Sequence, residues 1–207
     1  MLIQIKKGRD GPATLACVRA DGTRTWGKEH PFFPTHDLTH CAVESVLVFD
    51  QAFFGLIATG WDIDDFAKPG ASRRMPFQAI VAEHVVGVFD RERALPAPLS
   101  VAEFNETVVT SLPPAQRDAF RLCSDAQLSQ VRELRKTLEA RWHALPVGAT
   151  MDIEFPLNDK GVTMGLPPLK KEPGPVKLPE PPKPRPPEPW EPARIPRDPE
   201  PPKPPGR

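Results

Sequence analysis

Apolar and polar residues alternate at both ends of the region expected to fold, which is typical of β-strands. Residues 2–28 show this alternation, and Asp21-Gly22 within them is a common two-residue turn of a β-hairpin. Residues 149–157, "ATMDIEFPL", alternate again. We expect this late strand to return and pair with the N-terminal hairpin, forming a small antiparallel sheet.

Between these two ends, the apolar residues recur at helical spacing. Residues 35–55 start at Thr35, a good N-cap residue, and contain no glycine or proline before Gly55. Residues 76–90 form a second apolar pattern of the same kind. Both segments are therefore predicted to be core helices, joined by a turn-rich acidic loop.

Three further helices are predicted from their start signals. Ser100 and Glu103 have the spacing of a capping box, a proline pair opens a short helix near residue 113, and Ser124 caps a longer helix. The resulting fold class is α+β, with a small antiparallel sheet from both chain ends packed on a helical cluster.

From about residue 166 the composition changes sharply. Proline recurs every two or three residues among Lys, Arg and Glu, and such a segment cannot bury enough apolar surface to fold. We therefore expect an α+β domain over residues 1–160 and a disordered proline-rich tail over residues 166–207. Lys183, Pro186 and Pro189 match the basic-xxPxxP pattern that SH3-type grooves bind, so a protein partner of the tail is an alternative to a free extension.

Charge and cysteine content narrow the classes of function. The chain has 27 basic and 27 acidic residues and no basic block in the expected domain, which argues against nucleic-acid binding. No stretch approaches the roughly 20 apolar residues that span a bilayer, so no membrane partner is expected. Three widely spaced cysteines fit reduced thiols in a cytoplasmic protein.

The first predicted helix carries a polar stripe that its apolar surroundings do not explain. His36, His40 and Glu44 are four residues apart and thus lie along one side of the helix. Two histidines at this spacing can direct their imidazoles at one metal ion. The candidate ligands are His36, His40 and Glu44, with His84 of the second helix as a further ligand. Zinc is the first expectation, and iron or manganese suit the same residues.

Two other interpretations of this stripe remain open. It could be a polar face in contact with water, or a buried pair of histidines satisfied by hydrogen bonds with Glu44 as the partner of His40. Geometry also limits the metal hypothesis, because His36 and Glu44 are about 12 Å apart along a straight helix. Glu44 could then orient His40 rather than bind the ion directly.

The segment "HDLTH" resembles the HDxxH…Glu zinc motif of the ubiquinone-biosynthesis family of small helical proteins. That resemblance implies zinc binding by His36, Asp37 and His40. The glutamate of the family motif follows about a dozen residues later, where this chain has Ala52. The longer phrase "HDLTHCAVE…FFGLIATGWDI" is similar to a group of small uncharacterised bacterial proteins.

These observations predict a cytoplasmic metal-binding protein, a metal-dependent hydrolase or lyase acting on an unidentified small molecule. Asp37 would then be the catalytic residue, as a ligand or acting on metal-bound water. The alternative is a non-catalytic interaction protein with a structural His/Glu core and a partner-binding tail. The sequence contains no P-loop, GxGxxG turn or GxSxG elbow that would identify a substrate.

Overall fold

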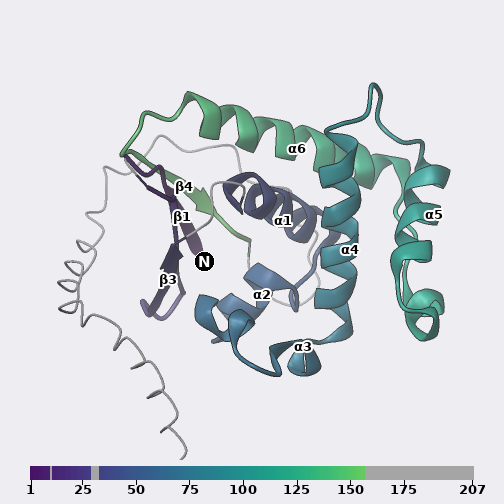
Figure 1. The fold of residues 1–207 in the computed structure, drawn as a ribbon, viewed down its shortest axis with the longest axis horizontal. Helices are drawn as coiled ribbons and strands as arrows, with labels where there is room; N and C mark the ends of the chain where they lie inside the picture. Colours follow the sequence, from purple (N-terminus) through teal and green to yellow (C-terminus); the bar gives the residue numbers. More distant parts are fainter. Residues whose placement is uncertain (10, 29–32, 157–207) are drawn as a thin grey trace, which may run out of the picture. The chain divides into compact units, whose positions relative to one another are not determined.

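The computed structural model describes residues 1–9, 11–28 and 33–156, and they adopt an α+β fold (Figure 1). One four-stranded antiparallel sheet has the strand order β3-β2-β1-β4. Its strands are β1 (Leu2–Lys6), β2 (Thr14–Val18), β3 (Arg24–Lys28) and β4 (Thr150–Glu154). Because β1 pairs with β2 on one side and β4 on the other, the predicted sheet from both chain ends is confirmed.

The register of the sheet follows from its alternating pattern. Ile3 in β1 lies opposite Cys17 in β2 and Ile153 in β4, and all three side chains are buried. A shift by one residue would turn these apolar side chains away from the core. The hairpin between β2 and β3 turns through Gly22, whose φ of 83° suits glycine.

The helical part consists of six α-helices and two 3-10 helices in the described residues. They are α1 (Phe33–Leu47), α2 (Phe53–Ala58), η1 (Ile63–Ala67), α3 (Ala71–Arg74), α4 (Phe77–Glu92), α5 (Val101–Ser111), η2 (Pro114–Ala119) and α6 (Asp125–Ala144). Helix α1 lies in the middle and packs against α6, α4 and α2 (Figure 1). This central position explains why α1 is apolar on most sides.

The predicted helix over residues 35–55 is divided in the structure. Helix α1 already begins at Phe33, so Thr35 lies inside the helix rather than at its N-cap, and α1 ends at Leu47. Val48 has a left-handed backbone with φ 59°, and the Phe49 amide donates to the Glu44 carbonyl over 2.9 Å. A left-handed residue closes a helix in this way, although glycine usually occupies that position.

The predicted starts of the two later long helices, α5 and α6, agree with the structure. Capping boxes form at Ser100 with Glu103 and at Ser124 with Gln127. The acidic connection predicted as a loop contains two short helices, η1 and α3, and Asp62 and Asp65 make a further capping box at the start of η1.

The predicted domain boundary near residue 160 and the proline-rich tail lie outside the described residues. Within the part of the chain that the structure covers, no helix has the length and apolar character needed to cross a bilayer.

Candidate metal centre

Three potential metal ligands meet where α1 packs on α4. His36 and His40 come from α1 and Glu83 comes from α4, and their ligand atoms lie within 4.8 Å of one another. The Nε2 atom of His40 is 3.4 Å from one Glu83 oxygen, and that of His36 is 4.0 Å from the other. Two imidazole nitrogens and a carboxylate therefore converge on one point.

Each histidine is held from behind by a second carboxylate. His36 Nδ1 lies 2.7 Å from Asp90 Oδ2, and His40 Nδ1 lies 3.1 Å from Glu44 Oε1. An ionised carboxylate only accepts hydrogen bonds, so the proton of each neutral ring is on Nδ1. When the rings are neutral, the lone pair is on Nε2, the atom that faces Glu83, as in the carboxylate–histidine–metal arrangement of metalloproteins.

Glu44 is fixed by the helix that follows it. Its second oxygen accepts hydrogen bonds from the backbone amides of Phe54, at 2.9 Å, and Gly55, at 3.1 Å, in α2. The side chain is completely buried. Burial raises the pKa of Glu44, although His40 and the two amides act in the opposite direction.

Asp90 is fixed on the other side of the site. Thr39 Oγ1 donates to it over 3.2 Å and Arg93 Nη1 over 2.6 Å. Arg93 also donates to Glu139 of α6, at 2.7 Å. Burial would raise the pKa of Asp90, but His36 and Arg93 lower it, so the group is an anion that holds His36 in place.

The carboxylates make the site attractive to a positive charge. Burial of His40 lowers its pKa, but Glu44 and Glu83 outweigh this effect and raise the pKa to about 10. Burial raises the pKa of Glu83, and the histidines more than compensate, lowering it below its usual value. A proton or a metal ion at Nε2 of His40 satisfies the same negative surroundings.

The predicted ligands have different positions in the structure. His36 and His40 belong to the three-residue group, whereas Glu44 lies behind His40, as its distance along the helix suggested. Asp37 is buried but does not belong to the group, since one residue turns the helix by about 100°. Burial raises the pKa of the Cys41 thiol, and the negative charges of Glu44 and Asp37 add to this effect.

His84 is directed to another element. Its Nδ1 lies 3.0 Å from Ser111 Oγ in α5, whereas we expected the side chain beside His40 or Glu44. The neighbouring Glu83 contributes to the ligand group instead. The sequence contains a pattern that indicates this role of Glu83. Glu83 and Asp90 are seven residues apart, close to two helical turns, and so lie on the same face of α4.

No family model matches this chain, and comparisons with curated proteins and with solved structures found no match either. The chemistry of the site therefore has to be inferred from its geometry.

Proposed function

We propose that the protein binds a divalent transition-metal ion through His36 Nε2, His40 Nε2 and the Glu83 carboxylate. The observation that carries this proposal is the pair of carboxylates behind the two histidines, Asp90 and Glu44. Such partners fix the ring orientation and make imidazole a better ligand. Zinc is the first candidate, and iron and manganese suit the same nitrogen and oxygen donors.

The ligand set supports a catalytic rather than a purely structural ion. Structural zinc sites are closed by four protein ligands, whereas two histidines and one glutamate leave a position for water. The side chains of His36 and Glu83 are 21% and 55% exposed, so solvent and a small substrate can reach the ion. Metal-bound water becomes a nucleophile near neutral pH, which supports a hydrolase, with a lyase as the related choice.

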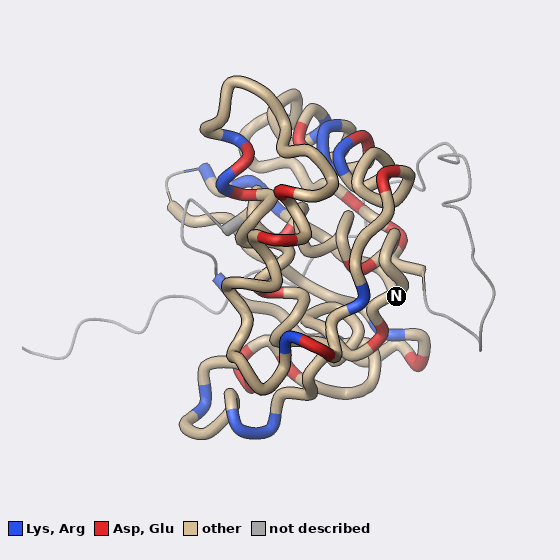
Figure 2. The backbone as a smooth tube through the Cα atoms, turned by 90° about the vertical axis from the view of Figure 1, so that its right-hand side faces the viewer, with Lys and Arg blue, Asp and Glu red and all other residues tan. Residues whose placement is uncertain are grey.

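Charge distribution supports a small molecule as the substrate. Basic and acidic residues are interspersed along the described backbone (Figure 2), so no long basic segment of the described chain favours nucleic acid as the substrate. A cytoplasmic location is part of the proposal. Asp37, predicted to act on metal-bound water, has no role in this form of the site.

The second candidate is a structural network without an ion. Protonated His40 can bridge Glu44 and Glu83, and Glu44 in turn holds the start of α2. This arrangement ties α1, α2 and α4 together by hydrogen bonds alone. It would suit a non-catalytic interaction protein whose partner binds the proline-rich tail.

Metal content separates the two candidates. Protein purified without chelator should contain about one ion per chain by elemental analysis, as a single three-ligand site requires. Glu83→Gln should lose most of that metal, because the substitution removes a ligand charge at a half-exposed position with little effect on packing.

The neighbouring residue provides the matched control. His84→Gln alters the same turn of α4 but not the ligand group, so its metal content should equal that of the wild type. Metal-free wild-type protein that also fails to bind added zinc, iron(II) and manganese would exclude the metal proposal and favour the structural network.

A further inference from the structure

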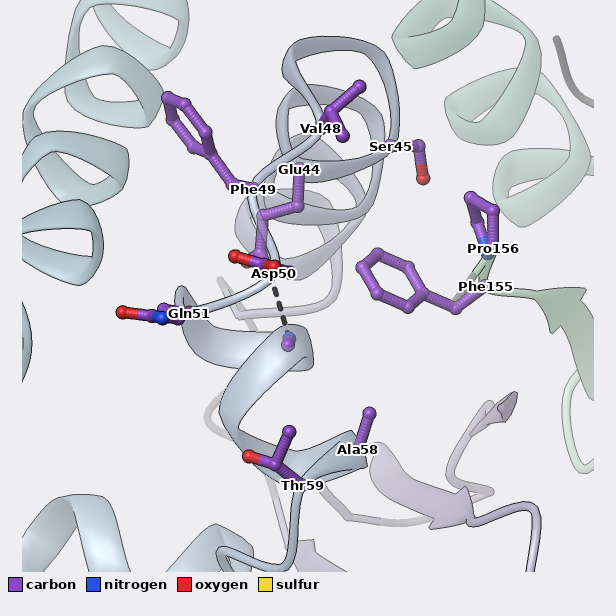
Figure 3. Close-up of a pocket in the computed structure, with 11 residues that line it drawn as sticks. Glu44, Ser45, Val48, Phe49, Asp50, Gln51, Ala58, Thr59, Phe155 and Pro156 are labelled. Atoms are coloured by element: carbon purple, nitrogen blue, oxygen red, sulfur yellow. Dashed lines mark hydrogen bonds between the residues drawn. The ribbon is translucent and has the colours of Figure 1, made fainter. Parts of the chain in front are cut away.

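A cavity of about 320 Å³ borders Glu44, the carboxylate that contacts His40 of the candidate metal centre (Figure 3). It is formed by the end of α1, the connection to α2, α2 itself and the residues after β4. Its volume is in the range of pockets that hold small molecules. Nothing in the proposed metal chemistry uses this space.

Two features of its wall are uncommon in a protein core. The Ser45 hydroxyl is buried and makes no hydrogen bond with a nitrogen or oxygen atom of the described residues; only the weakly bonding Cys41 thiol lies beside it. Val48 has a left-handed backbone, which is unfavourable for a β-branched side chain. Unsatisfied polar groups and backbone strain concentrate at binding sites.

The lining indicates the chemical class of the ligand. It includes the carboxylates of Glu44 and Asp50 but no lysine or arginine. The Phe155 ring points toward Glu44 and Asp50 in Figure 3, and Phe49 is a second aromatic residue of the lining. Acidic and aromatic groups together recognise organic cations.

We propose that this cavity binds a small organic ammonium ion with a short apolar chain. The exposed Asp50 carboxylate accepts hydrogen bonds from the ammonium group, and the Phe155 ring contacts the cation with its face. Ser45 and Thr59 also line this space.

The proposed ligand site is separate from the metal centre. Glu44 stands between them, and both of its oxygens are already engaged, one with His40 and the other with α2. Asp50 is therefore the carboxylate available to a ligand. Binding at the cavity requires no metal ion, so it can be tested whether or not the metal proposal holds.

Thermal unfolding of the full chain, after treatment with chelator, tests the proposal with n-butylammonium chloride as the probe. A ligand of the folded state raises the melting temperature with its concentration. We expect n-butylammonium to produce this rise, and sodium butyrate and 1-butanol at equal concentrations to produce none. Asp50→Asn should abolish the rise, whereas Asp64→Asn, at an exposed acid outside the cavity, should retain it.

A second variant guards against effects of charge alone. Ala58→Met places a larger side chain in the lining and should remove the response to n-butylammonium while the ligand-free protein still unfolds cooperatively. The proposal is overturned if n-butylammonium leaves the wild type unchanged. It is equally overturned if butyrate stabilises the protein as much, or if Asp50→Asn responds like the wild type.

Discussion

The two histidines of the candidate metal centre differ in their surroundings. His40 is 2% exposed and is held by a carboxylate that is itself fixed by backbone amides. His36 is 21% exposed, and its partner Asp90 is held by side chains, Thr39 and Arg93. The first arrangement depends on the backbone of α2, whereas the second can be altered without disturbing a helix.

Asp90→Asn should therefore weaken metal binding while leaving the fold intact. The amide no longer holds the His36 proton on Nδ1 as firmly, and loss of such a partner typically reduces metal affinity by about 10- to 100-fold. Competition with a chromophoric chelator measures the affinity. Asp118→Asn, at an exposed position in η2, is the control, and equal affinities in both variants would contradict this role of Asp90.

At the residue scale, the sequence predicted one half of the site. His36 and His40 are four apart on one helix, so local periodicity is sufficient to bring them together. Glu83 and Asp90 come from α4, more than 40 positions later, as the numbering shows. Only the packing of α4 on α1 selects Glu83 rather than its neighbour His84, and periodicity alone does not fix that rotation.

At the scale of the elements, the short connection between α1 and α2 determines the position of Glu44. Gly55 permits it, because a Cβ atom there would lie 2.3 Å from the carbonyl carbon and oxygen of Asp50. Gly87 in α4 is different, since a Cβ atom at that position would meet nothing within 4 Å. The two glycines thus form a natural pair for comparison.

Gly55→Ala should destabilise the protein, by about 1–3 kcal/mol as in other overpacked sites, because the backbone of the connection must move. Gly87→Ala should stabilise it by up to about 1 kcal/mol, since alanine favours a helix more than glycine does. Urea unfolding of both variants measures the difference. A Gly55→Ala variant as stable as the wild type would show that the connection adapts without cost.

At the scale of the whole molecule, the sheet and the long helices were predictable from periodicity, and the start of α5 was predictable from its capping box. The division of the first predicted helix was not, because Val48 is a residue type that rarely adopts a left-handed backbone. Tertiary contacts overrode the local preference there: the buried Glu44 accepts hydrogen bonds from the start of α2.

Burial of the thiols in the described region predicts a loss of stability at alkaline pH. Burial raises the pKa of Cys123 from 9.0 to about 11 and, together with Glu44, that of Cys41 to about 12. Above pH 9 the unfolded chain loses these protons before the folded chain does, so the free energy of unfolding falls as pH rises toward 11. Urea unfolding at pH 8 and pH 10 measures the effect.

A variant with Cys41 and Cys123 replaced by alanine should lose less stability over that interval. An equal loss in both proteins would assign the alkaline effect to other groups.

The two oxygens of Glu44 connect the His40 ring to the backbone of the connection between α1 and α2. A movement of α2 away from α1 would also free His40 from its hydrogen bond with Glu44. A cation bound to His40 would, in turn, stabilise the position of α2. Such coupling is reciprocal by thermodynamic necessity. Proteases that attack the segment between the two helices would therefore cleave more slowly when an ion is bound, and the cleaved chain would hold the ion less tightly.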